Sequence, residues 1–148
     1  MLGFLTSAEV LATVVVTLLI SQFRGIRAGP ALLLLASLIG AGTMTLGVFA
    51  GNPVALFLGV ALVGAGLSFD VIENTVIQVQ VPEQLLSRVY SVNVVASFAL
   101  LPLGEAAAGL LARWAGSSWV FAGGGAVLIT FCLWASLLRP VRALNLRL

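Results

Sequence analysis

The chain has 148 residues, of which 61% are hydrophobic and only 8% are charged, and its mean hydropathy is +1.18. Soluble domains are about 45–50% apolar and about 25% charged, so this composition excludes an ordinary water-soluble fold. The net charge of +2 is too small to indicate a nucleic-acid partner. Histidine is absent and Cys132 is the single cysteine, which excludes histidine-based catalysis, a disulfide framework and a cysteine metal site.

Five apolar segments are long enough to cross a membrane, because a spanning helix needs about 20 mostly apolar residues. In chain order the predicted helices cover about residues 2–23, 29–50, 53–80, 84–113 and 118–138. The connections are short, so helices adjacent in sequence should pack antiparallel as hairpins. The sequence therefore predicts an all-α, polytopic membrane protein whose main surroundings are the lipid bilayer.

The third segment, residues 53–80, carries a face of small and polar residues at helical spacing. It includes Gly59, Gly66, Asp70, Glu73 and Asn74. Small residues allow close approach of another helix, while polar side chains need partners away from lipid. One interpretation is a packing seam with a few interhelical hydrogen bonds, which we favour for the glycines. The other is a substrate or proton pathway, for which Asp70, Glu73 and Asn74 are candidates.

The fourth segment, residues 84–113, has a similar stripe. Asn93 and Ser97 join the pathway candidates, and Gly104 and Ala108 continue the same face. Pro102 removes a backbone donor inside the helix and is expected to kink it. This segment also carries Glu105, which either lines an outward vestibule or is a solvated outlier.

A polar connection joins these two segments. Pro82 breaks the chain there, Gln78 precedes it, and Glu83 and Arg88 follow it. A solvated pair between Glu83 and Arg88 is the simplest interpretation, and it would contribute at most about 1 kcal/mol. The alternative is a motif that holds the cytoplasmic ends of the two helices.

The arginines predict the orientation of the chain. Six of them follow the first, third and fifth helices, and Arg113 alone lies on the other side; the six are Arg24, Arg27, Arg88, Arg139, Arg142 and Arg147. Cytoplasmic loops are enriched in arginine and lysine, so we expect an outside N-terminus and a cytoplasmic C-terminus in the inner (cell) membrane.

Two strings carry a family resemblance: TVIQVQVPEQLLSRVYSV from Thr75 and PLGEAAAGLLA from Pro102. They resemble the tenth and eleventh helices of major facilitator superfamily transporters, in the branch of macrolide/drug efflux and siderophore exporters. The matching residues are Gln78, Val81, Pro82, Glu83, Arg88, Val89, Pro102, Gly104 and Gly109. The string SQFRGIRAGP resembles the loop between the eighth and ninth helices. Ser87 and Glu105 depart from the pattern, where the family usually has a glycine and a small or apolar residue.

The resemblance spans the whole chain as helices eight to twelve, so it implies part of the C-terminal half of that fold. It also implies a secondary active antiporter that exports small hydrophobic or amphipathic molecules, with protons coupled through Asp70 or Glu73. The remaining helices would come from an N-terminal half or a partner chain. The alternative is a non-transporting remnant or small subunit that associates with another membrane chain. An enzyme is the weakest option, because no paired nucleophile and base is found, and no cofactor or metal is expected.

Overall fold

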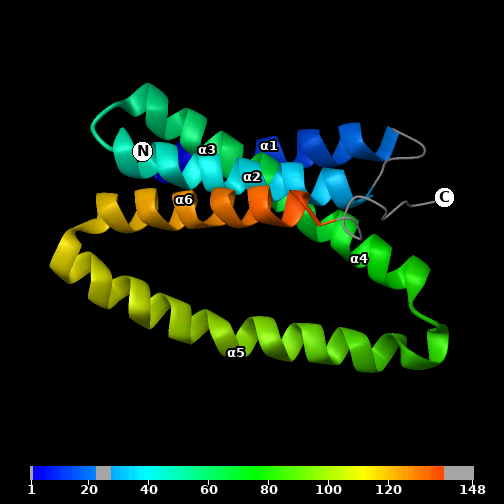
Figure 1. Cartoon of the computed structure of the whole chain (residues 1–148). Helices are drawn as coiled ribbons and strands as arrows, with labels where there is room; N and C mark the ends of the chain where they lie inside the picture. The colour runs from blue at the N-terminus through cyan, green and yellow to red at the C-terminus, as the bar shows by residue number, and fades with distance from the viewer. Residues whose placement is uncertain (1, 23–27, 139–148) are drawn as a thin grey trace.

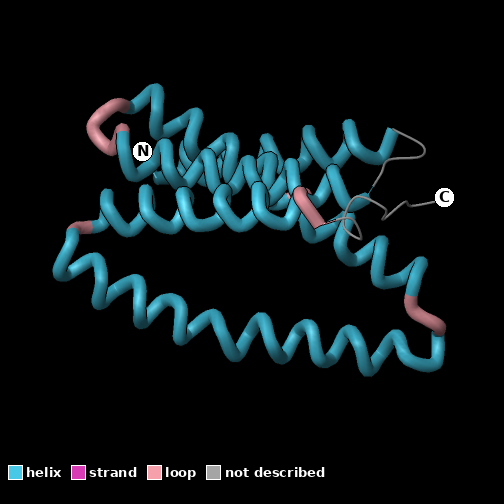
Figure 2. The backbone as a smooth tube through the Cα atoms, viewed as in Figure 1, coloured by secondary structure: helices cyan, strands magenta, loops and turns pink. Residues whose placement is uncertain are grey.

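The structure, a computed structural model, describes residues 2–22 and 28–138, whose regular structure is entirely helical (Figures 1 and 2). The helices are α1 (Leu2–Gln22), α2 (Ala28–Val48), α3 (Pro53–Leu67), α4 (Phe69–Gln80), α5 (Glu83–Ala115) and α6 (Ser117–Ser136). Five stretches are long and apolar enough to cross a membrane, and α3 and α4 together form the third of them. Within the described residues, the prediction of an all-helical chain with five segments long and apolar enough to cross a membrane is thereby confirmed.

The helix ends follow local chemistry. The side-chain oxygen of Asn52 accepts a hydrogen bond from the N–H of Val54 at 3.0 Å and so caps α3. Pro82 precedes α5 with an extended backbone, and its carbonyl accepts the N–H of Leu85 at 2.9 Å. Gly116 joins α5 to α6 with φ of +87°, a conformation that glycine adopts without steric cost.

Helix α2 lies at the centre of the packing, against α3 on one side and α6 on the other. Its contacts depend on glycines: a Cβ built on Gly42 would lie 2.6 Å from the carbonyl oxygen of Gly59, and one on Gly66 would lie 2.7 Å from that of Leu35. We call these contacts the α2 seam. Its glycines, which let the helix backbones touch, are Gly40, Gly42, Gly47, Gly59, Gly66 and Gly125.

Helix α1 packs on α3 instead of forming the expected hairpin with α2. The register shows that the two helices run parallel, because Glu9 of α1 lies beside Gly64 and Thr17 lies beside Ser68. Helices that are adjacent in sequence therefore form only some of the predicted hairpins: α2 packs on α3 and α5 contacts α6, but α1 does not pair with α2 in this way. The reason is that α2 uses its two small-residue faces on α3 and α6, while α1 finds its polar partners on α3.

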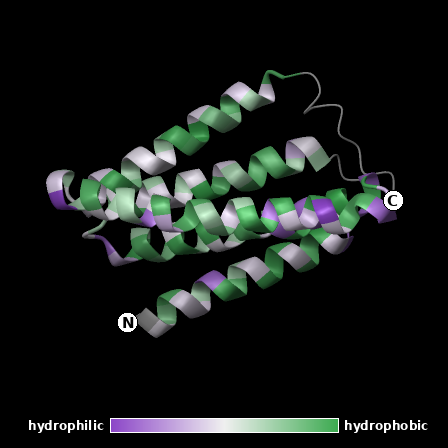
Figure 3. Ribbon diagram, turned by 90° about the horizontal axis from the view of Figure 1, so that it is seen from below, coloured by the Kyte–Doolittle hydropathy of each residue, from purple (hydrophilic) through white to green (hydrophobic). Residues whose placement is uncertain are grey.

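The buried apolar core among the described residues is small. Ala28, Leu35 and Ile72 form it where α2 meets α4, and Val16 and Phe69 pack against it. Large apolar side chains instead cover the outside, where hydrophobic colouring runs along the lengths of the helices (Figure 3). This distribution is typical of a protein whose exterior contacts lipid, because the bilayer provides no driving force to bury apolar groups.

The predicted third helix differs in one respect, since it is broken at Ser68 into α3 and α4. Beyond the break α4 diverges from α2, and α5 then runs apart from the rest of the molecule before it meets α6 at Gly116 (Figure 1). Every residue of α5 is described, and none is buried. We call residues 69–115, which comprise α4 and α5, the α4–α5 arm.

Candidate functional site

Most of the predicted pathway residues lie on the α4–α5 arm. Asp70 is exposed in the first turn of α4, directly after the break, while Glu73 and Asn74 are partly buried. The Asn74 side-chain amide donates a hydrogen bond to the backbone carbonyl of Asp70 at 2.8 Å, so one of its donors is used within the helix. The predicted face of the third segment is divided, because Gly59 and Gly66 are buried against α2 whereas Asp70 is exposed.

On α5, Asn93 is partly buried and Ser97 is exposed. Helices α4 and α5 diverge from their connection at Pro82 (Figure 1), so Asp70, at the far end of α4, is not brought beside Ser97. The helix continues through Pro102 as one element. Glu105 is exposed in the half of α5 nearer α6. The structure thus leaves these polar groups exposed or partly buried and does not gather them into a closed site.

The connecting motif lies at the junction of the two helices of the arm. Gln78, Pro82, Glu83 and Arg88 are all exposed. Glu83 stands in the first turn of α5, where a carboxylate interacts favourably with the positive end of the helix dipole. This geometry gives Glu83 a structural role at the helix start that does not require Arg88.

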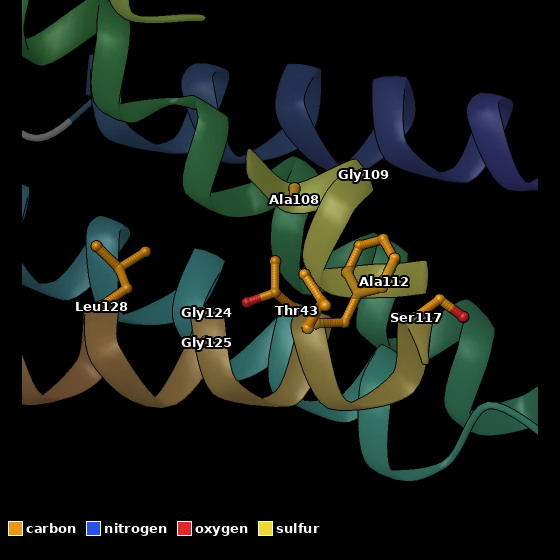
Figure 4. A pocket seen from close by; sticks show the side chains of 10 residues that line it. Thr43, Ala108, Gly109, Ala112, Ser117, Gly124, Gly125 and Leu128 are labelled. Carbon is orange, nitrogen blue, oxygen red and sulfur yellow. The ribbon is translucent and has the colours of Figure 1, made fainter. Parts of the chain in front are cut away.

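The arm leaves a wedge beside α6, with an apolar hollow of about 420 Å³ (Figure 4). A second hollow of about 490 Å³ shares Ala108, Val120 and Gly124 with the first. Gly104 and Gly109 belong to this wedge, and a Cβ built on either would meet nothing within 4 Å. We call this region the α5–α6 wedge. Small residues at four-residue spacing on α5, namely Gly104, Ala108 and Ala112, and the run of glycines at 123–125 of α6 are the sequence signal for it.

The sequence analysis did not identify a group of three hydroxyls on α1 and at the helix break. Ser68 is fully buried, and its hydroxyl lies 3.1 Å from that of Thr17 and 3.3 Å from the carbonyl oxygen of Thr13. The spacing of Thr13 and Thr17, four residues apart on one helical face, is the available signal. Their partners come from a segment more than 50 residues away, which no local pattern discloses.

The described segments that could cross a membrane carry carboxylates, amides and hydroxyls, together with the thiol of Cys132 and the guanidinium groups of Arg88 and Arg113. Among residues 2–22 and 28–138, no three acidic, histidine or cysteine residues come together as a metal site would require. Comparison with protein-family models, with curated proteins and with solved structures finds no match. The case for a function therefore depends on the residues and their placement.

Proposed function

We propose that the chain forms helices eight to twelve of a secondary active efflux transporter of the major facilitator superfamily, which exports small hydrophobic or amphipathic molecules. The observation that carries the proposal is the exposure of Asp70 on a segment that is long and apolar enough to cross a membrane. A charged group in hydrocarbon costs about 2.5–3.5 kcal/mol on insertion scales. Such groups therefore face an aqueous path or another protein segment, as they would on a wall that faces the other half of a transporter.

In this proposal the α4–α5 arm faces the substrate path. Asp70 accepts and releases a proton as the site alternates between the two sides of the membrane, with Glu73 as the neighbouring acid on the same helix. Asn74, Asn93 and Ser97 offer hydrogen bonds to a substrate that is otherwise held by apolar contacts. The exposed apolar side chains of the arm suit amphipathic molecules, because such a substrate has few polar groups that need a hydrogen-bonding partner.

The proposed orientation has the N-terminus outside and the C-terminus in the cytoplasm. Of the seven arginines, Arg88 and Arg113 are described, while Arg24, Arg27, Arg139, Arg142 and Arg147 lie outside the described residues. The connection between α4 and α5 would then be cytoplasmic, and the connection between α2 and α3 would be external.

Cysteine labelling tests the orientation. In a Cys132→Ala background, Gly51→Cys and Gln84→Cys place thiols at exposed positions in the two connections, and Gly51 has open space around it. An impermeant maleimide added to intact cells should label position 51 and leave position 84 unlabelled. The reverse pattern would overturn the orientation.

Transport is tested by reconstitution in liposomes with a pH gradient, using a fluorescent hydrophobic dye and a macrolide as probes. The purified chain should give no saturable flux, because its polar surface lacks the opposing half of the path. The same chain joined to the seven preceding helices that the proposal requires should restore flux that depends on the gradient. Flux from the chain alone would overturn the proposal. It would also be overturned if the joined protein folds but gives no flux, and this chain instead binds another membrane protein.

A further inference from the structure

Two tryptophans flank the turn between α5 and α6, and both are exposed. Trp114, in the last turn of α5, is 90% exposed, and Trp119, in the first turn of α6, is 74% exposed. Gly116 alone separates the two helices, so both indoles lie at the same end of the molecule (Figure 1). An indole combines a large apolar ring with one N–H donor, so it suits a place where apolar and aqueous surroundings meet.

Arg113 adds a positive charge to this turn. It is exposed in the last turn of α5. The nearest acid on the same helix is Glu105, eight residues earlier and therefore about 12 Å away along the helix axis. No aspartate or glutamate follows Glu105 in the sequence, so α6 carries no acid. The turn is thus positively charged, and its electrostatic complement is an anionic group outside these two helices.

The lengths of the two helices indicate where this turn lies relative to a membrane. Helix α6 has 20 residues and is about 30 Å long, which equals the thickness of the hydrocarbon core of a bilayer. If α6 crosses the membrane, its first turn lies at one border of that core. Helix α5 has 33 residues and is about 50 Å long, so it exceeds the core. Because Gly116 ties its end to α6, the surplus lies toward Glu83.

We propose that Arg113, Trp114 and Trp119 form a lipid anchor, which holds the α5–α6 turn in the headgroup layer of one leaflet. Both indoles lie at the border between headgroups and hydrocarbon, where tryptophan is enriched in membrane proteins. The Arg113 guanidinium donates hydrogen bonds to a phospholipid phosphate and favours anionic lipids. This inference goes beyond the proposed function, because it requires only that the chain inserts in a membrane.

The lipid anchor sets the depth of the rest of α5. Leu103 precedes Trp114 by eleven residues, so it lies about 16 Å further along the helix and near the middle of a core about 30 Å thick. Glu105 is two residues from Leu103 and is exposed. At that depth the carboxyl of Glu105 does not reach the headgroups of either leaflet.

Depth-dependent quenching of tryptophan fluorescence tests the anchor. The chain has three tryptophans, so replacing two of them by phenylalanine leaves either Trp114 or Trp119 as the only fluorophore. Each variant is reconstituted in phosphatidylcholine vesicles that contain a lipid with a nitroxide on its acyl chain. The shallow label is near the ester end, and the deep label is near the methyl end. We expect the shallow label to quench both tryptophans more strongly than the deep label does.

Leu103→Trp, in a chain whose own tryptophans are all phenylalanine, is the matched control, because Leu103 is also exposed on α5. At position 103 the deep label should quench more strongly than the shallow label. The same order of quenching at position 103 and at the two native tryptophans would overturn the anchor. Quenching of Trp114 and Trp119 by aqueous iodide but by neither lipid label would overturn it too. So would protection from all three quenchers, which would indicate a contact with protein, such as a second copy of the chain.

Arg113→Gln tests the contact with phosphate. In vesicles made from equal parts of phosphatidylcholine and phosphatidylglycerol, either lipid can carry the shallow label. With Arg113 present, the anionic lipid should be enriched roughly twofold to fivefold around Trp114, and Arg113→Gln should remove that preference. Arg88→Gln, near the other end of α5, is the matched control and should keep it. An equal preference with and without Arg113 would overturn the assigned role of this arginine.

Discussion

The glycines of the α2 seam and those of the α5–α6 wedge are the same residue type in opposite surroundings. At Gly42 and Gly66 a single added carbon would press on the backbone of a neighbouring helix, whereas at Gly104 and Gly109 it would meet open space. The seam glycines hold helices together by direct backbone contact. The wedge glycines have no such partner among the described residues. The number of glycines in a helix therefore does not show whether another helix packs against it. What lies opposite each glycine decides that.

The largest expected effect comes from filling the seam. Gly42→Leu would place its Cβ 2.6 Å from the Gly59 carbonyl, and backbone cannot yield as a flexible side chain does. Overpacking costs about 1–3 kcal/mol or more, so we expect a large loss of folded protein. Gly104→Leu is the matched control and should fold normally. Helicity during titration with a denaturing detergent measures the difference, and equal behaviour of the two variants would contradict the comparison.

A smaller effect is expected on the arm, where Asp70→Asn keeps shape and removes charge. If the proposed function holds, this variant of the assembled transporter should fold, lose efflux several-fold and lose its dependence on pH, because the proposed proton carrier is gone. Glu83→Gln, which changes an exposed acid at the start of α5, is the control and should keep the pH profile. Efflux measured across pH in both variants distinguishes them. An unchanged profile in Asp70→Asn would leave a structural role only.

The connection inside the arm gives a further test. Arg88→Ala should impair efflux more than Arg142→Ala, which lies outside the described residues, if Arg88 holds the cytoplasmic ends of α4 and α5. Efflux is compared at equal expression. Equal losses would mean that Arg88 only sets the orientation of the chain.

The smallest effect belongs to the hairpin that joins α2 and α3. Asn52→Ala removes the cap on α3 and should cost about 1 kcal/mol of stability. Asn52→Asp preserves an oxygen acceptor at the same position and should behave like the unaltered chain. The same detergent titration measures both. A loss as large as that of Gly42→Leu would show that the hairpin, and not the seam, dominates stability.

Much of the helix layout follows from the sequence, because length and hydropathy decide it locally. The predicted segment 84–113 corresponds to α5 at Glu83–Ala115, and Pro82 separates it from α4 as expected. The packing of α1 was not foreseen. Its partner depends on Gly64 and Ser68 in a distant segment, and short connections alone do not specify which neighbour a helix contacts.

The break at Ser68 illustrates the limit most clearly. Serine is a tolerable residue inside an apolar helix, and no proline marks the position. At the break, the hydroxyls of Thr13 and Thr17 of α1 contact the Gly64 carbonyl and the Ser68 hydroxyl, which is a property of two helices together. For the candidate site, the sequence analysis identified the polar residues of α4 and α5, but it placed those of α4 on one helix face with the seam glycines Gly59 and Gly66. The divergence of α4 from α2 separates them.

The pairing of α2 with α6 has a consequence for biogenesis. Helices leave the ribosome in chain order, so Gly40 and Gly47 emerge long before the α6 backbone that they contact. Until α6 has been made, one face of α2 remains without its partner. Helix α1 likewise has to wait for α3, which packs parallel to it, because α2 is made in between. Assembly therefore finishes from the C-terminal end, and a ribosome that stalls within α5 would release a chain with its central helix half covered. Such a product is a natural target for membrane quality control.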